Sequence, residues 1–147
     1  MKFPEWLMVF GDVDYRGECS KEGYEMTTAF NQIKKRWPEI GAIAVHPKNE
    51  GKRQKGQFRQ LEMEKAAGYV KGASDIIIPG SPTFACELKR KDHTQSSWQP
   101  GQLDYLKACQ EQGAFVCVAL GWQGVIEAIE EWNAKRPHQK PLAAGAD

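Results

Sequence analysis

The segment between residues 75 and 89 constrains the fold of this chain more than any other part. Three successive isoleucines, Ile76 to Ile78, precede the turn sequence Pro79-Gly80-Ser81-Pro82 and a second run that ends at Lys89. A short β-branched run that stops at proline and glycine predicts a buried strand. Side chains alternate across a strand, so the second run should divide into two faces. These faces are Phe84, Cys86 and Leu88 on one side, and Ala85, Glu87 and Lys89 on the other.

The carboxylates and the ammonium group of this segment suggest metal-dependent hydrolysis. Asp75 stands at the start of the first strand, and Glu87 and Lys89 lie on the second. Carboxylates from neighbouring strands can share a hard cation such as Mg²⁺, which keeps several waters. The cation can activate a water, which the lysine can hold or deprotonate. An exposed hairpin with Glu87 and Lys89 on a solvated face explains the same spacing, so spacing alone leaves both interpretations open.

Apolar periodicity predicts helices and strands in the rest of the chain. The predicted helices cover residues 20–37, 57–67, 102–113 and 122–132, and the further strands cover residues 41–45 and 114–120. Ser20 is the expected N-cap of the first helix, and Pro38 is expected to end it. The helix between Lys89 and Ala114 can form the crossover that parallel strands require. This order predicts an α/β (α+β) domain on a mixed sheet.

Two acidic residues of the first predicted helix are further candidates for the metal site. Glu22 lies one turn before Met26 on the apolar side, and Glu25 lies at the edge of that side, one turn before Ala29. Either carboxylate can point inward from such a position. The helix dipole also favours acidic residues in a first turn, and this structural explanation stays open for both.

Two basic clusters are candidates for contact with nucleic acid, although the net charge of +1 gives no global field. The first is a glycine-punctuated loop that carries Lys48, Lys52, Arg53 and Lys55. The second is Arg90 and Lys91, directly after Lys89. Basic side chains can displace counterions from phosphates, but runs of charge are usually just solvated. Trp98 can stack on a base or cap the next helix.

The composition indicates one ordinary globular domain. A chain of 147 residues with 41% hydrophobic residues can form a core without disulfides. The four cysteines include no Cys-x-x-Cys pair, which disfavours zinc and suits a reducing cytoplasm. The apolar run from Trp6 to Phe10 is too short to span a bilayer, so no membrane contact is expected. We expect an N-terminal arm or extra strand in residues 1–19, a domain from 20 to 136 and a flexible tail from 137 to 147.

Four elements of the sequence together resemble one nuclease superfamily. They are Gly72-x-x-Asp75, Glu87-Leu88-Lys89, Gln102-x-x-x-Leu106 and His46-Pro47-Lys48-Asn49-Glu50-Gly51. Their order is similar to that of PD-(D/E)XK nucleases, and more narrowly to small, phage-type, stand-alone members of the VRR-NUC family. The resemblance spans residues 19 to 132. Ser74 departs from the superfamily pattern, which usually has a proline before the first aspartate.

The resemblance implies a restriction-endonuclease-like fold, a mixed β-sheet flanked by helices, and a Mg²⁺- or Mn²⁺-dependent endodeoxyribonuclease. Asp75 and Glu87 would hold the cation, with help from the Leu88 carbonyl and a glutamate of the first helix. Glu25 is preferred for that glutamate, and Glu22 is the second choice.

The resemblance also implies roles for residues around the metal. Lys89 would position the attacking water, and Gln102 would orient the lysine or the scissile phosphate. His46 and Asn49 would contact DNA. The basic residues expected to join them are Lys48, Lys52, Arg53, Lys55, Arg90 and Lys91.

The expected substrate is branched or Holliday-junction DNA, because a chain of this size has no room for a separate recognition domain. The resemblance further implies a homodimer in a phage or in the cytoplasm of a bacterial host, and oligomers generally favour closed symmetry. Two alternatives stay open: a nucleic-acid-binding module with an inactive nuclease-like site, and an interaction protein with a solvated hairpin. Gln102 on an apolar helix face weighs against the second.

Overall fold

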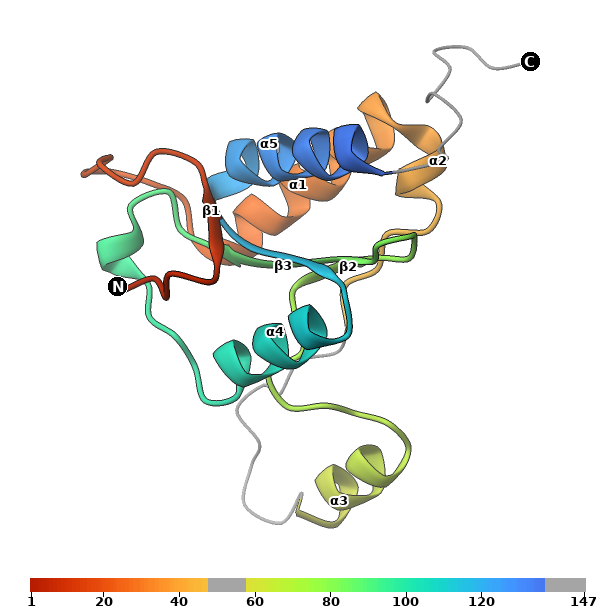
Figure 1. Ribbon diagram of the computed structural model, residues 1–147. Coiled ribbons are helices and arrows are strands. Elements are labelled where there is room, and N and C mark those ends of the chain that lie inside the picture. Colours follow the sequence, from red (N-terminus) through yellow and green to blue (C-terminus); the bar gives the residue numbers. More distant parts are fainter. Residues whose placement is uncertain (48–57, 137–147) are drawn as a thin grey trace.

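The computed structural model describes residues 1–47 and 58–136 (Figure 1). In chain order its elements are β1 (Met8–Phe10), α1 (Glu22–Arg36), α2 (Pro38–Gly41), α3 (Phe58–Ala66), β2 (Ile76–Ile78), β3 (Phe84–Lys89), a 3-10 turn (His93–Gln95), α4 (Gln102–Glu111), β4 (Phe115–Leu120) and α5 (Gly121–Lys135). Within the described ranges, no helix has both the length and the apolar character needed to cross a membrane.

The described strands form one mixed sheet in the order β1-β4-β3-β2. The two strands predicted on either side of the turn at residues 79–82 are confirmed, and β2 and β3 pair antiparallel as a hairpin with Ile76 opposite Cys86. The parallel pairing is confirmed as well, since β3 runs parallel to β4 and α4 connects them. β1 lies beside β4 at the far edge, so the N-terminal residues supply the extra strand that the sequence had left open.

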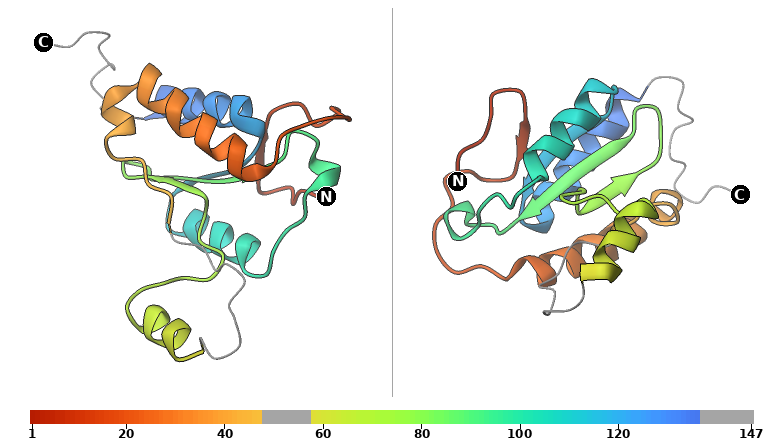
Figure 2. Two further views of the ribbon diagram at one scale, coloured as in Figure 1. Left: turned by 180° about the vertical axis from the view of Figure 1, so that it is seen from behind. Right: turned by 90° about the horizontal axis from the view of Figure 1, so that it is seen from below.

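Helices cover both faces of this sheet (Figures 1 and 2). α1 and α5 pack together over one face, and α4 lies against the other. The alternation predicted for β3 is observed, because Phe84, Cys86 and Leu88 join the core with residues of α1 and α5. Ala85 joins the opposite core together with Leu106 of α4. The chain is therefore the predicted α/β domain, with a mixed sheet flanked by helices.

The strand predicted for residues 41–45 is wrong. α2 ends at Gly41, and the next residues form a turn in which Ala44 donates a 2.9 Å hydrogen bond to the carbonyl of Ile40. Ile40 is buried in the core, whereas Val45 is 50% exposed and forms an isolated bridge with Ile77. Residues 41–45 therefore make a turn and a single bridge, because local hydrogen bonds replace the pairing of a strand.

Local packing explains how the first two helices meet. The N-cap of α1 is Lys21 and makes no side-chain bond, so the predicted Ser20 cap is wrong. Pro38 ends α1 as expected and begins α2, since a proline fits the first turn of a helix. A Cβ on Gly41 would lie 2.8 Å from the Cα of Lys34. Glycine therefore allows α2 to fold back tightly onto α1.

Candidate functional site

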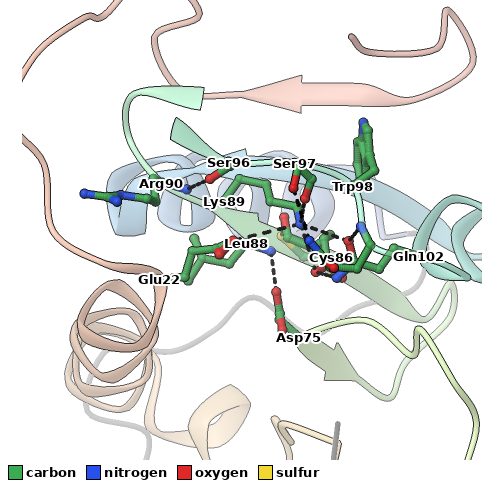
Figure 3. A network of polar contacts seen from close by, with 12 residues as sticks. Glu22, Asp75, Cys86, Leu88, Lys89, Arg90, Ser96, Ser97, Trp98 and Gln102 are labelled. Carbon is green, nitrogen blue, oxygen red and sulfur yellow. Dashed lines mark hydrogen bonds and ion pairs between the residues drawn. The ribbon is translucent and has the colours of Figure 1, made fainter. Parts of the chain in front are cut away.

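The start of β2 and the end of β3 bring Asp75 and Lys89 to the same end of the hairpin (Figure 3), and Glu87 lies two residues before Lys89 on β3. The register that pairs Ile76 with Cys86 sets Asp75 opposite Glu87, and residues opposite each other share one face of a sheet. All three side chains are buried, with Glu87 1% and Lys89 2% exposed. This juxtaposition is not the solvated hairpin face of the alternative interpretation.

Asp75 continues the hairpin by one further contact after the last main-chain pair. Its Oδ2 accepts a 2.9 Å hydrogen bond from the backbone nitrogen of Leu88. In a strand, the N–H and C=O of one residue point to the same side. The Leu88 carbonyl therefore points toward the side where β2 has ended and where the Asp75 carboxylate lies.

Lys89 is held by neutral oxygens as well as by charged ones. Its Nζ donates to the Ser97 carbonyl oxygen at 2.8 Å and to Gln102 Oε1 at 2.9 Å. It lies 3.8 Å from Glu87 Oε1 and 3.9 Å from Glu22 Oε1. An ammonium has three N–H groups, so two serve the neutral oxygens and one position faces the carboxylates or a water.

Gln102 joins the carboxylate to the lysine. Its Nε2 donates a 2.7 Å hydrogen bond to Glu87 Oε1, while its Oε1 accepts from Lys89 and from the backbone nitrogen of Gln99. This pattern fixes which end of the amide faces which partner.

The start of α4 lies close to Gly72. A Cβ added to Gly72 would lie 2.3 Å from the carbonyl carbon of Gly101. Glycine at position 72 therefore lets the segment before Asp75 pack against the start of α4.

Burial and the neighbouring negative charge of Asp75 disfavour the ionised form of Glu87. Burial raises the pKa of Glu87 well above its usual range, and the neighbouring Asp75 raises it further, against the opposing effect of Lys89. Within the described residues, Glu87 Oε2 is buried without a hydrogen-bond partner. A buried acceptor without a donor is unfavourable unless a cation or water completes its coordination.

A cavity of about 910 Å³ opens over this group. Residues of the first turns of α1 and His46 line one part of it, and the loop that leads from Gln95 into α4 lines another. Because the cavity is open to solvent on one side, a polymeric substrate can reach the carboxylates without first entering the core.

The two glutamates of α1 occupy different places. Glu22 lines the cavity, and burial raises its pKa, while Lys89 lowers it and Asp75 raises it. Glu25 instead accepts a 2.7 Å hydrogen bond from the backbone nitrogen of Trp122, at the start of α5. This contact caps α5. Of the two glutamates, Glu22 therefore faces the cavity and Glu25 contacts α5, whereas the sequence favoured Glu25 for the site.

The residues expected to contact DNA are only partly described. His46 lines the cavity, and its Nδ1 lies 2.6 Å from the carbonyl oxygen of Asp75. Arg90 donates to the Cys19 carbonyl, and Lys91 lies over the Tyr15 ring, so both have local contacts. The remaining predicted contacts lie outside the described residues; they are Lys48, Asn49, Lys52, Arg53 and Lys55.

Sequence reasoning missed two neighbours of Lys89. The Ser97 carbonyl is one of its acceptors, and no side-chain pattern announces a main-chain oxygen. The Trp98 ring lies 5.3 Å from its Nζ, while the indole N–H donates to the Lys2 carbonyl. An aromatic face attracts a cation, so this ring helps to fix the position of the Lys89 ammonium instead of capping α4.

The donor set fits a hard divalent cation better than a softer metal. Among residues 1–47 and 58–136, no group of three or more His, Cys, Asp or Glu side chains is placed to hold a metal ion by itself. Two adjacent carboxylates and a main-chain carbonyl are oxygen donors, as Mg²⁺ and Mn²⁺ prefer, and Mg²⁺ usually keeps several waters. The unpartnered Oε2 of Glu87 is consistent with this fit.

Comparison with known proteins supports the fold. No protein-family model matches the sequence, and the search of curated proteins found no match. A solved structure described as a VRR_NUC domain protein superposes with a TM-score of 0.66 at 18% identity, over 88% of this chain and 100% of that one. The chain therefore has a VRR-NUC-like fold, in which a four-stranded mixed sheet lies between helices as in restriction endonucleases.

Proposed function

We propose that this protein is a Mg²⁺- or Mn²⁺-dependent endonuclease that hydrolyses phosphodiester bonds in DNA. The main support for the proposal is that the buried side chains of Asp75, Glu87 and Lys89 lie together beneath an open cavity. Gln102 forms hydrogen bonds with both Glu87 and Lys89. A VRR-NUC-like fold supports the assignment to a nuclease class.

The metal ligands in this proposal are Asp75, Glu87 and the Leu88 carbonyl, with Glu22 at the side of the cavity. A bound divalent cation supplies Lewis-acid stabilisation of the charge that develops on the phosphoryl group. The two carboxylates would bind it, and the hydrogen bond from the Leu88 nitrogen orients Asp75 for this. Glu25 has no part in this set, because its carboxylate caps α5.

Lys89 orients the attacking water in this proposal. The Ser97 and Gln102 oxygens fix two of its N–H directions, so the third N–H of Nζ can donate to the oxygen of a water and orient it. The Trp98 ring restricts the side chain further. A fixed nitrogen beside the scissile phosphate lowers the entropic cost of aligning the nucleophile.

The proposed substrate is branched DNA, such as a Holliday junction, bound by a homodimer. A single small domain can recognise the shape and flexibility of DNA more readily than a long base sequence. Two equivalent sites related by a two-fold axis would suit a junction with two symmetric cleavage points.

Cleavage of a labelled four-way junction tests the proposal. Wild type should cut in Mg²⁺ or Mn²⁺ and not in EDTA, and Asp75→Ala and Lys89→Ala should lose at least about 100-fold in rate. Both variants should still bind the junction in EDTA. Lys135→Ala is a matched control, because it removes an exposed lysine from the far end of α5. Cutting by the Asp75 and Lys89 variants at the wild-type rate would contradict the proposal.

The alternative function is a nucleic-acid-binding module with an inactive nuclease-like site. The same assay separates the two, because such a module binds the junction and cuts it under no metal condition. The unpartnered buried oxygen of Glu87 favours the enzyme, since a binding module gains nothing from that cost.

A further inference from the structure

His46 stands where a main-chain donor is missing at the outer edge of β2. Val45 and Ile77 exchange two hydrogen bonds of 2.9 Å. Continued in the same antiparallel register, this bridge would set Pro47 opposite Asp75. Proline has no N–H, so the main chain cannot donate to the Asp75 carbonyl there. The His46 ring supplies the contact instead, with Nδ1 at 2.6 Å from that oxygen.

Asp75 is therefore held from two sides by contacts that extend the sheet. On the inner side, its Oδ2 accepts from the Leu88 nitrogen at 2.9 Å. On the outer side, its carbonyl faces His46. Asp75 precedes the first residue of β2, so the His46 contact continues the edge of the sheet by one residue beyond the strand.

The chemistry of the contact fixes the direction of the hydrogen bond. A backbone carbonyl can only accept, so Nδ1 of His46 must carry the hydrogen. The neutral ring then has its lone pair on Nε2 and cannot donate to a phosphate oxygen, which is itself an acceptor. In this form His46 is badly suited to the DNA contact expected from the sequence.

We propose that His46 is a positioning residue of the metal site, which acts by fixing the Asp75 peptide and through it the carboxylate. The inference rests on the proposed function, because it takes Asp75 as a metal ligand. Hydrogen-bond partners that orient metal ligands commonly change metal affinity by about 10- to 100-fold when removed.

Three variants of the full chain test this role. His46→Ala removes the donor, and His46→Asn restores one, because the Asn amide nitrogen is placed like Nδ1 of histidine. His46→Gln is the matched control, since it keeps the amide but moves it by one methylene. Mn²⁺ affinity is measured by calorimetry without DNA, junction affinity by fluorescence anisotropy in EDTA, and folding by thermal unfolding. Nitrogen NMR of the wild-type ring reports its tautomer.

The expected result is a loss of roughly 10-fold in Mn²⁺ affinity for His46→Ala and His46→Gln, recovery in His46→Asn, and unchanged junction affinity in all three. The wild-type ring should be protonated at Nδ1. Unchanged Mn²⁺ affinity in a folded His46→Ala, a loss confined to junction affinity, or an Nε2-protonated neutral ring would overturn the inference while wild type still binds Mn²⁺ and cuts. Wild type that neither binds Mn²⁺ nor cuts would overturn the proposed function and this inference with it.

Discussion

Replacing Glu87 by glutamine should stabilise the metal-free protein while removing its metal site. The buried Oε2 of Glu87 has no partner among the described residues, and the pKa of Glu87 is raised by burial and by Asp75 even with Lys89 nearby. The raised pKa of Glu87 already includes the attraction of Lys89, so the ionised form of Glu87 is unfavourable in the folded protein even beside this cation. A glutamine keeps the Oε1 acceptor for Gln102 and removes the buried charge.

The expected gain follows from removing the buried charge, because burying an unsatisfied group of this kind costs at least about 1–3 kcal/mol. For a chain of this length each kcal/mol corresponds to roughly 4 °C, so Glu87→Gln should raise the Tm in EDTA by about 4–12 °C. Thermal unfolding followed by circular dichroism measures this shift. Mn²⁺ at about 100 times its Kd should stabilise wild type by about 2.7 kcal/mol and the variant far less.

The pH dependence gives the sign of the effect. A carboxyl whose pKa is higher in the folded state binds its proton more tightly there, so wild-type stability falls as pH rises above the ordinary value of 4.5. The advantage of Glu87→Gln should be absent below that pH and should grow until Glu87 is fully ionised in the folded protein. A variant that is less stable than wild type in EDTA at pH 8, or an advantage that shrinks as pH rises, would refute this reasoning.

Three further predictions concern the surroundings of the site. Gln102→Leu should slow single-turnover cleavage by roughly 10- to 100-fold with unchanged junction affinity, because Glu87 and Lys89 lose their shared partner; an unchanged rate would exclude the bridging role. Glu25→Ala should lower the free energy of unfolding by about 0.5–2 kcal/mol in denaturant titrations and leave Mn²⁺ affinity unchanged, since it removes the cap of α5; a loss of Mn²⁺ affinity would return Glu25 to the metal site. Removing the loop cations should weaken junction binding and reduce the slope of log K against log salt by about 0.9 for each lost phosphate contact, and an unaltered slope would take the loop off the DNA path. The substitutions for that test are Lys52→Ala, Arg53→Ala and Lys55→Ala.

Periodicity of two and of 3.6 residues was sufficient to predict the sheet and the helices that cover it. The hairpin, the parallel β3–β4 pair and the facing of β3 all follow from local patterns whose apolar residues are buried together in the structure. The strand predicted at residues 41–45 failed because its apolar residues do not share a buried face. Ile40, just before this segment, is buried as part of the helix α2. A pattern of five residues does not distinguish a strand from the end of a helix followed by a turn.

The part of the candidate site that depends on strand register could be predicted from the sequence. Once β2 and β3 pair, the position of Asp75 opposite Glu87 is fixed by counting residues. Glu22 and Glu25 are three residues apart on α1, and only the start of α5, nearly a hundred residues later, decides which of them is occupied by a cap. The Ser97 carbonyl was out of reach for a related reason, because a main-chain acceptor has no signature in residue type.

The most direct test of the central claim is an anomalous difference map from crystals soaked in Mn²⁺. We expect a peak at roughly 2.1 Å from a carboxylate oxygen of both Asp75 and Glu87, with the Leu88 carbonyl beside it. A peak bound elsewhere, or none at this position in a protein that cuts DNA, would contradict the account.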